Sequence, residues 1–482
     1  MIYFFIIGIP CLLGLIALMI SQDHWRPWLL PFGCALNLSA VISCWKTPPA
    51  FLNGWLGLDE LSLIVITLVA VIFLISSIYC LEYLRLRRDR HNRLFTACLF
   101  FTLAALNLVS MSRHMGLLWI GMEMTTLATA PLIYFNRNEK SLEATWKYLM
   151  MSSLGIGFAL LGTFFLSAST LSLPFKGNAL SLDTLLAQGP ALSAQWLKGA
   201  FILLLVGYGT KMGLSPLHFW KPDAYGESPG VVGAILSGAV ISAPFLGILR
   251  AFQICSCAGL GDFCRELWLL MGLLSMGTAA VFIIRQRDFK RMLAYSSVEH
   301  MGILALGAGL GPLGLWAALL HLINNGLTKG LLFLSAGNIH RAFGGKTMEH
   351  AKGALKRAPI SAALFLLGFF AIAGIPPFSP FISEFSILRA ALGSNHLLIA
   401  LSFIGLLSLI FIGMANTVLA VVYGVPPDDR HSSLPEKAER FPFMLAAPII
   451  FLVLIIFLGL WIPHWLSRSL LHAAQILNGE KA

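Results

Sequence analysis

Charge is the scarcest property of this sequence. Only 11% of its 482 residues are Asp, Glu, Lys or Arg, whereas 57% are hydrophobic. A chain so poor in charge cannot cover the surface of water-soluble domains, so that class of protein is excluded. The eight cysteines form no C-x-x-C pair, and no haem, flavin, iron–sulfur or zinc motif is present. The sequence therefore predicts no cofactor, no metal site and no redox centre of its own.

Long apolar runs are abundant instead. Runs of roughly 17 to 25 residues, the length at which a helix crosses a bilayer, recur along the whole chain. They predict an all-α polytopic membrane protein with about 14 transmembrane helices. The predicted spans are 2–20, 28–45, 61–83, 94–112, 115–135, 145–170, 198–219, 229–250, 266–285, 297–311, 313–339, 359–391, 396–424 and 442–463. The span at 359–391 is interrupted, and the one at 297–311 is short.

The net charge of +11 could indicate a nucleic-acid partner. The positions of the basic residues decide whether it does. Most lysines and arginines fall in alternate loops between the spans, and the densest of these loops is 85-RLRRDRHNR-93. This pattern predicts topology anchors beside the lipid bilayer and no nucleic-acid interface. By the positive-inside rule, the N-terminus and, for an even number of spans, the C-terminus are predicted outside.

Lys211 and Glu123 are charged residues inside apolar spans. Lys211 lies in 201-FILLLVGYGTKMGLSPLHFW-220, just before Ser215-Pro216, a pair that breaks a helix. Glu123 lies about eight residues into its span, roughly 12 Å along a helix and so near mid-membrane. Two plainer interpretations are a carboxyl group that only links helices and a lysine that snorkels to the interface. Ionisable groups at this depth favour proton transfer instead.

A second polar set lies within one apolar span. His321, Asn325 and Lys329 are spaced four residues apart and share one helical face. His321 alone could be a core histidine bonded to a backbone carbonyl, but the aligned Lys329 favours a proton relay. Glu384 follows 374-GIPPFSPFISEF-385, where three prolines break the helix. Two broken spans, each with a buried ionisable group, are typical of transporters built from repeats.

Three more residues are candidate proton-entrance groups. His218 lies at the predicted inner end of the first broken span. Glu299 and His300 lie in 288-DFKRMLAYSSVEHMG-302, where the chain is predicted to re-enter the membrane, so they either accept protons or cap a helix. Nearby Asp223 and Glu227 are predicted to belong to a solvated loop.

The most specific stretches of the sequence are 209-GTKMGLSPLHFWKPDA-224, 288-DFKRMLAYSSVEHMG-302, 320-LHLINNGLTKGLLFLSAGNI-339 and 373-AGIPPFSPFISEF-385. Together they resemble the proton-translocating antiporter-like family shared by respiratory complex I, Mrp-type sodium/proton antiporters and membrane-bound hydrogenases. The resemblance covers nearly the whole chain. Within the family, 141-SLEATWKYLMMSSLGIGFALLGT-163 is most similar to the hydrogenase-4 component F branch of the formate hydrogenlyase type.

The resemblance implies two inverted five-helix repeats, with helices 7 and 12 broken. It divides the chain into helices 1–3 (1–93), a first repeat of helices 4–8 (94–250), a second repeat of helices 9–13 (251–424), and helix 14 with a short tail (425–482). It also implies that Glu123 and Lys211 form a carboxylate–lysine pair, that Lys329 is the central relay lysine, and that Glu384 is the terminal group. His321 then serves the path between the lysines and Glu384.

The sequence departs from the family pattern in the eighth helix. Relatives usually carry a histidine or lysine there, but 231-VVGAILSGAVISAPFLGIL-249 offers only Ser237, Ser242 and Pro244. A connection between Lys211 and Lys329 would then need water or His321. Asn325 also stands where relatives often have histidine.

The leading hypothesis is a proton-translocating subunit of a hydrogenase-4-like or complex I-like redox-driven complex in the bacterial cytoplasmic membrane. It implies other membrane subunits and a peripheral redox arm as partners. No residue of this chain is then catalytic, because the redox chemistry belongs to that arm. Two alternatives remain open: an Mrp-type sodium/proton antiporter or other ion-coupling subunit, and a non-pumping membrane scaffold for a catalytic arm.

Overall fold

The computed structural model describes residues 2–46, 54–87, 89–171, 179–425, 439 and 441–479, and helices account for most of them. Within these residues, 11 helical segments are long and apolar enough to cross a membrane. The remaining predicted spans correspond to α8 (Ala194–Met212), to α13 (Phe289–Gly309), and to the pair α16 (Pro359–Ile372) and α17 (Ser379–Gly393). The prediction of an all-α polytopic membrane protein is confirmed.

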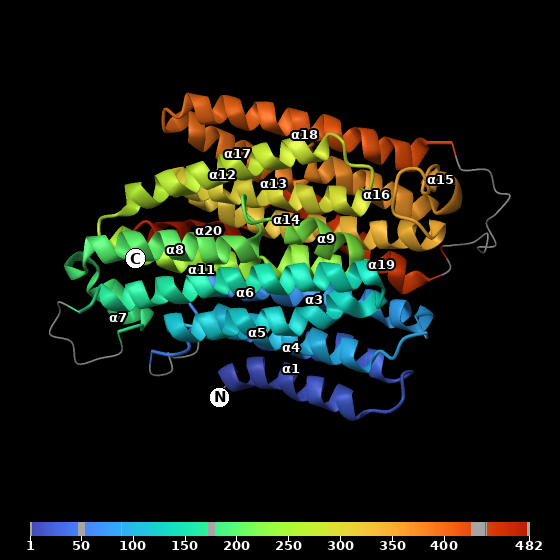
Figure 1. Ribbon diagram of the computed structural model, residues 1–482, viewed down its shortest axis with the longest axis horizontal. Helices are drawn as coiled ribbons and strands as arrows, with labels where there is room; N and C mark the ends of the chain where they lie inside the picture. The colour runs from blue at the N-terminus through green and yellow to red at the C-terminus, as the bar shows by residue number, and fades with distance from the viewer. Residues whose placement is uncertain are drawn as a thin grey trace.

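The long helices run side by side, from α1 at one edge of the bundle to α18 at the other (Figure 1). The helices of the first half are α1 (Ile2–Met19), α2 (Leu29–Lys46), α3 (Glu60–Leu86), α4 (Arg93–Met111), α5 (Met115–Ile133), α6 (Glu139–Ala168), α7 (Leu182–Ala187), α9 (Trp220–Glu227), α10 (Gly230–Ile235) and α11 (Ser242–Cys257). Those of the second half are α12 (Gly261–Ile283), α14 (Gly311–Phe343), α15 (Ala354–Arg357), α18 (Leu397–Tyr423), α19 (Pro442–Leu460) and α20 (His464–Leu477). A π-helical turn, Leu236–Val240, precedes α11 within one continuous segment.

The polar helix α14 lies at the centre of the bundle. It is 33 residues long and packs against α3, α10, α13, α16, α17, α19 and α20. In contrast, the edge helices α1 and α18 expose apolar side chains such as Met19 and Leu398, as expected of helices that face lipid. Because protein surrounds α14, its ionisable side chains are kept away from the hydrocarbon of the bilayer.

The first broken helix consists of α8 and α9. Helix α8 ends at Met212 because Gly213 adopts a left-handed conformation with φ of +84°. The chain therefore leaves the helix slightly before Ser215-Pro216, the pair that marks the break in the sequence. A short connection follows, and α9 begins at Trp220.

The second broken helix consists of α16 and α17. Gly374, with φ of +66°, follows the end of α16 and turns the chain away from the helix. Pro376 and Pro377 lie in the break, as predicted. Pro380 instead lies in the first turn of α17, where a proline begins a helix rather than breaks one.

Helix α13 is longer than the short span predicted at 297–311. Its N-cap is Asp288, whose carboxylate accepts hydrogen bonds from the backbone N–H of Lys290 (2.9 Å) and of Arg291 (3.1 Å). The helix thus begins well before Glu299 and His300. The prediction that these two residues lie at the point of re-entry or cap a helix is wrong, because both lie in the middle of α13.

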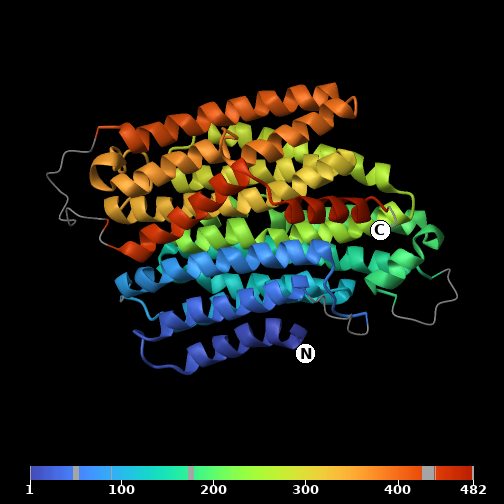
Figure 2. The same ribbon diagram turned by 180° about the vertical axis from the view of Figure 1, so that it is seen from behind.

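The two ends of the described chain lie at the same end of the bundle. Helix α1 begins there, and α20 ends there after packing against α3 and α14 (Figures 1 and 2). The chain therefore crosses the bundle an even number of times, which agrees with the predicted number of spans.

Candidate functional site

Lys211 lies in the last turn of α8, and its ammonium group contacts α5. The Lys211 Nζ donates to the carbonyl oxygen of Met122 and to the hydroxyl of Thr126, the latter at 2.5 Å. The residue is only 2% exposed. The carbonyl end of a helix carries partial negative charge, so the last turn of α8 favours a cation at this position.

Glu123 is the predicted partner of Lys211, and it lies on α5 between the two residues that bind the lysine. Its side chain is half-buried, and its Oε2 has no hydrogen-bond partner among the described residues. The carboxylate interacts electrostatically with Lys211, although the Lys211 ammonium bonds to Met122 and Thr126. Glu123 and Lys211 thus lie on neighbouring helices, as predicted, but no direct hydrogen bond joins their side chains.

Lys329 has a similar set of neighbours in the second half. It is fully buried on α14, and its Nζ donates to the Leu293 carbonyl (3.1 Å) and the Ser296 hydroxyl (3.0 Å), both on α13. Glu299, buried on the same helix, is the acidic group that attracts the Lys329 ammonium electrostatically. Each half therefore holds one lysine between a carbonyl, a hydroxyl and a nearby carboxylate.

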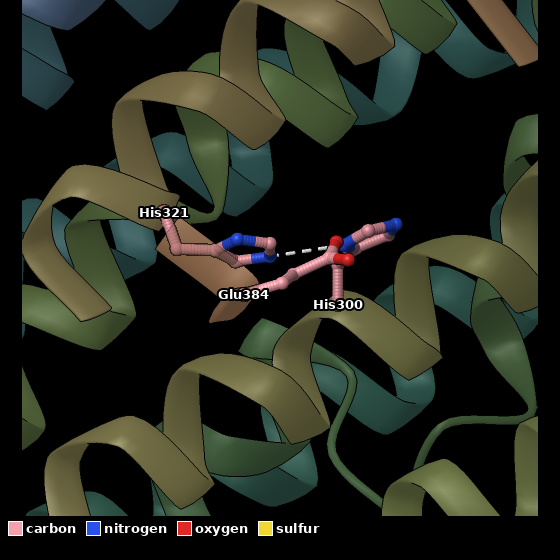
Figure 3. A group of neighbouring side chains, drawn as sticks. All are labelled: His300, His321 and Glu384. Atoms are coloured by element: carbon pink, nitrogen blue, oxygen red, sulfur yellow. Dashed lines mark hydrogen bonds between the residues drawn. The ribbon is translucent and has the colours of Figure 1, made fainter. Parts of the chain in front are cut away.

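Two histidines form a hydrogen-bonded pair between α13 and α14. The His300 Nδ1 and His321 Nε2 atoms are 2.9 Å apart, and the two rings are stacked (Figure 3). The His321 Nδ1 is 3.0 Å from the hydroxyl of Ser383 on α17. Neither histidine is more than 1% exposed, so the pair is shielded from solvent.

The hydrogen bonds around Ser383 indicate how the protons are arranged. The Ser383 hydroxyl donates to the Pro380 carbonyl and accepts from the Asn324 amide, so it is placed to accept from His321 Nδ1–H. The neutral His321 then accepts at Nε2 from His300 Nδ1–H. This arrangement leaves His300 Nε2, which has no hydrogen-bond partner among the described residues, as the site where a proton can be added.

Glu384 joins this histidine pair from the second broken helix. One carboxylate oxygen of Glu384 and one ring nitrogen each of His300 and His321 all lie within 4.8 Å of one another. The carboxylate points toward the histidine pair (Figure 3). Gly374 makes this position accessible, because a Cβ there would clash with Glu384 Oε2. These three side chains are also ligand types for Zn²⁺. The nearby Lys329 ammonium repels a cation at the histidines, so the surroundings suit single protons better than a divalent ion.

His218 lies in the connection between α8 and α9. It is 7% exposed, and its Nδ1 has no hydrogen-bond partner among the described residues. Its ring is surrounded by the aromatic rings of Phe219, Phe282 and Tyr295. The residue is therefore buried inside the first break rather than placed in a solvated loop.

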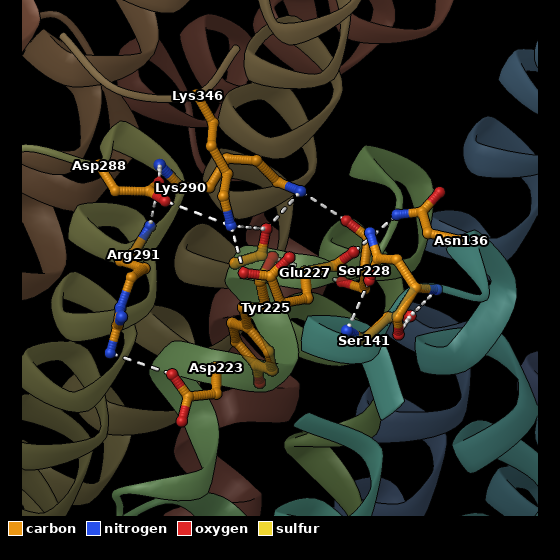
Figure 4. Close-up of polar contacts among 12 residues, drawn as sticks. Asn136, Ser141, Asp223, Tyr225, Glu227, Ser228, Asp288, Lys290, Arg291 and Lys346 are labelled. Atoms are coloured by element: carbon orange, nitrogen blue, oxygen red, sulfur yellow. Dashed lines mark hydrogen bonds and ion pairs between the residues drawn. The ribbon is translucent and has the colours of Figure 1, made fainter. Parts of the chain in front are cut away.

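A network of ion pairs surrounds α9 (Figure 4), which lies in the half of the bundle away from the termini (Figure 1). Asp223 pairs with Lys147 (2.8 Å) and Arg291 (3.0 Å), and Glu227 pairs with Lys346 (2.5 Å). The prediction that Asp223 and Glu227 belong to a solvated loop is wrong, because both lie on α9 and hold it against its neighbours. A pocket of about 440 Å³, lined in part by Glu227 and Lys346, opens beside this network.

The residues that hold the predicted groups in place were not predicted from the sequence. Thr126, Ser296 and Ser383 provide the hydroxyl contacts of Lys211, Lys329 and His321. A usable signal existed for Thr126, which lies three residues after Glu123 and so on the same helical face. Asn325 shares a face with His321 and Lys329 as predicted, but its amide has no hydrogen-bond partner among the described residues.

The fold is that of a polytopic membrane protein whose helical bundle encloses a series of ionisable side chains. Residues 112–411 match the family described as NADH:quinone oxidoreductase/Mrp antiporter, TM, and the chain belongs to this family. The resemblance predicted from the sequence is confirmed.

Two relatives and one solved structure illustrate what this chain is similar to. The chain is 31% identical over 445 residues to a hydrogenase-4 component F homolog of Methylacidiphilum infernorum, with 90% of each chain covered. It is 30% identical over 433 residues to NADH-quinone oxidoreductase subunit N of Desulforudis audaxviator, covering 85% of this chain and 82% of the relative. Its fold matches a chain of the Mrp complex from Dietzia sp. DQ12-45-1b with a TM-score of 0.87, at 18% identity over 99% of this chain and 97% of the other.

Proposed function

We propose that this chain translocates protons as a membrane subunit of a hydrogenase-4-like or complex I-like redox-driven complex. The observation that carries the proposal is the succession of buried ionisable side chains on α8, α13, α14 and α17, from Lys211 to Glu384. Such groups are costly inside a membrane and are retained where they move ions or protons. Membership of the antiporter-like family supports the same function.

In the first half, Lys211 is the proton-holding group and His218 is the group proposed for proton uptake. A carboxylate close to an ammonium favours its charged form. When Glu123 moves away from Lys211, this stabilisation is lost and the lysine can release its proton toward Lys329. The half-buried position of Glu123, with Oε2 unbonded among the described residues, supports such a movement.

In the second half, Lys329 passes the proton to the histidine pair, and Glu384 receives it at the end of the path. A proton added at His300 Nε2 can leave from His321 after the two rings exchange a proton along their hydrogen bond. The burial of Glu299 and His300 on α13 supports a role inside the path rather than at its entrance. Glu384 is close enough to both histidines to accept the proton.

Energy and partners must come from outside this chain. Moving one charge against a membrane potential costs ~2.3 kcal/mol per 100 mV. A peripheral redox arm supplies this energy, and neighbouring membrane subunits transmit it. We place the chain in the bacterial cytoplasmic membrane with both termini outside, which the distribution of basic loops supports.

The proposal is tested by proton flux into inverted vesicles that contain the assembled complex during redox turnover. Lys211→Ala and Lys329→Ala are each expected to lower proton uptake about tenfold or more. Lys198→Ala, which removes an exposed lysine of the same helix α8, is the matched control and should have no effect. Undiminished proton uptake in both buried-lysine variants would contradict the proposal. If these variants impair only assembly, the chain is a scaffold.

A sodium/proton antiporter subunit of Mrp type is the second candidate, favoured by the match to a chain of the Mrp complex. This function does not require a redox partner. Proton movement that depends on a sodium gradient, measured in vesicles without redox turnover, would select it. Proton uptake that depends on turnover and is indifferent to sodium would select the redox-driven complex.

A further inference from the structure

Residues 231–249, which form most of the segment from α10 to α11, carry no Asp, Glu, His, Lys, Arg, Cys or Tyr, and their hydroxyl groups are those of Ser237 and Ser242. Ser237 donates its hydroxyl proton to the Gly233 carbonyl (2.6 Å), and Ser242 donates to the Ala239 carbonyl (2.6 Å). Both hydroxyls thus bond within their own helical segment. The proposed path from Lys211 to Lys329 needs another residue to connect its halves.

Lys221, the second residue of α9, lies between those halves. It is fully buried, and its Nζ donates to the Met212 carbonyl at 2.8 Å and to the Ser297 carbonyl at 3.3 Å. Met212 ends α8, whereas Ser297 lies on α13. One ammonium group therefore bridges the first broken helix and a helix of the second half.

Each contact of Lys221 is adjacent in the chain to a relay lysine or to a hydrogen-bond partner of one. Met212 is the neighbour of Lys211 in the chain. On the other side, the Ser297 carbonyl belongs to the residue after Ser296, whose hydroxyl accepts from Lys329. The amines of Lys221 and Lys329 thus bind the same stretch of α13, and their charges repel each other.

The break in the first helix is shaped to admit this side chain. Gly213 has a φ of +84°, and a Cβ at that position would lie 2.7 Å from Lys221 Cδ and 2.8 Å from Lys221 Nζ. A residue other than glycine would meet both backbone strain and the lysine side chain. The position is therefore built around the amine of Lys221.

The partners of Lys221 also leave its protonation free to change. Within the described part of the chain, its Nζ hydrogen bonds go to two backbone carbonyls. Lys346, in contrast, pairs with the carboxylates of Glu227 and Asp288. A buried amine without a carboxylate bound to it can exchange between charged and neutral forms, as a proton carrier must.

We propose that Lys221 carries the proton between Lys211 and Lys329, in place of a base on the helix formed by α10 and α11. This inference rests on the proposed function. The neutral amine of Lys221 accepts a proton from the Lys211 ammonium and then releases it toward Lys329. Only N–H bonds form and break, and no group is oxidised or reduced.

The test compares Lys221→Arg with Lys221→His in the assembled complex, with proton uptake per redox turnover as the readout. Arginine keeps the charge and the donors to Met212 but does not deprotonate, whereas histidine is titratable. A proton carrier predicts about tenfold lower uptake for Lys221→Arg and a smaller loss for Lys221→His. A purely structural cation predicts the opposite order.

Lys290→Arg is the matched control, because Lys290 is also buried and donates to backbone carbonyls, here those of Gly226 and Ser228. It should retain proton uptake. If the Lys221→Arg complex does not assemble, Lys221→Gln replaces it in the test. Glutamine keeps a donor toward Met212 but does not titrate, so a proton carrier at this position again predicts lower proton uptake than in Lys221→His. Normal uptake in the Lys221 variants together with loss in Lys211→Ala overturns this inference alone. Normal uptake in Lys211→Ala and Lys329→Ala overturns the proposed function instead.

Discussion

The two broken helices share one backbone feature, but one accommodates a basic side chain and the other an acidic side chain. Each has a glycine with positive φ at the break, Gly213 in the first and Gly374 in the second. In the first, the break makes room for an amine, because Gly213 abuts Lys221. In the second, it makes room for a carboxylate, because Gly374 abuts Glu384.

This difference indicates that the two halves have different roles in the proposed proton transfer. The amines of Lys211 and Lys221 at the first break donate to carbonyl oxygens, and the one that Lys221 contacts at Met212 lies at the C-terminus of α8, where positive charge is favoured. At the second break, Glu384 lies beside the imidazoles of His300 and His321, which are joined by one hydrogen bond. The first half is thus suited to hold and release protons, and the second half to conduct and deliver them.

The largest expected effect follows from filling the space at either break. Gly374→Ala adds a Cβ that clashes with Glu384 Oε2, and Gly213→Ala adds one at 2.7 Å from Lys221 Cδ. Because either carboxylate or amine must then move, proton uptake per turnover should fall about tenfold or more in each variant. Gly157→Ala, on α6 with no atom within 4 Å of the new Cβ, is the control. Full uptake in Gly374→Ala would show that Glu384 is not tied to its break.

A second prediction distinguishes variants that lower the stability of the protein from variants that lower only its proton uptake. Asp59 caps α3 and binds Arg250 (2.6 Å) and Arg113 (3.3 Å), so Asp59→Ala should destabilise the protein by about 3 to 5 kcal/mol in detergent unfolding. The exposed pair Asp262–Arg265 provides the control, since Asp262→Ala should cost less than about 1 kcal/mol. The glycine variants at the breaks should not resemble Asp59→Ala in this measurement.

The same cluster has a defined pH dependence. Burial opposes ionisation of Asp59, but the charge and hydrogen bond of Arg250, with further help from Ser62 and Arg113, hold the pKa of Asp59 well below its usual range. A carboxyl with a lowered pKa stabilises the fold above the unfolded value of about 4, and this contribution is lost as pH falls toward the folded value. Wild type should therefore lose stability in that acidic range more steeply than Asp59→Ala. Parallel pH curves would contradict this assignment.

A smaller effect is expected from the hydroxyls that position the relay groups. Thr126→Val removes the hydroxyl contact of Lys211, and Ser383→Ala removes that of His321. A lost hydrogen bond is worth about 1 kcal/mol, so proton uptake should fall roughly fivefold in each. Ser386→Ala, on the same helix α17 but bonded only within it, is the control. If Ser383→Ala alone has an effect, positioning matters in the second half and not in the first.

The smallest effect is expected at Asn325. Its amide has no hydrogen-bond partner among the described residues, although it lies on the same face as His321 and Lys329. Asn325→Leu should therefore leave proton uptake within about twofold of wild type. Asn324→Leu is the contrast, because the Asn324 amide donates to the Ser379 carbonyl (2.8 Å) and the Ser383 hydroxyl (3.1 Å). A large loss in Asn325→Leu would add that residue to the path.

The sequence alone determined the class of protein and the number of spans, and it identified Lys211, His321, Lys329 and Glu384 as ionisable residues inside the spans. These features are local, because the length of an apolar run predicts a span and a proline or glycine predicts a break. The placement of His321 and Lys329 on one face likewise followed from helical periodicity. The start of α13 was missed because the N-cap signal of Asp288 lay in a segment assigned to a loop.

Only the tertiary structure decided which groups meet. Lys211 binds Thr126 and His321 binds Ser383, pairs that are 85 and 62 residues apart in the chain. Lys221, which the sequence predicts at the inner end of the first broken span, contacts both halves because α9 places its amine against the end of α8 and against α13. Such contacts follow from how helices pack, and single-sequence patterns carry no information about packing between distant segments.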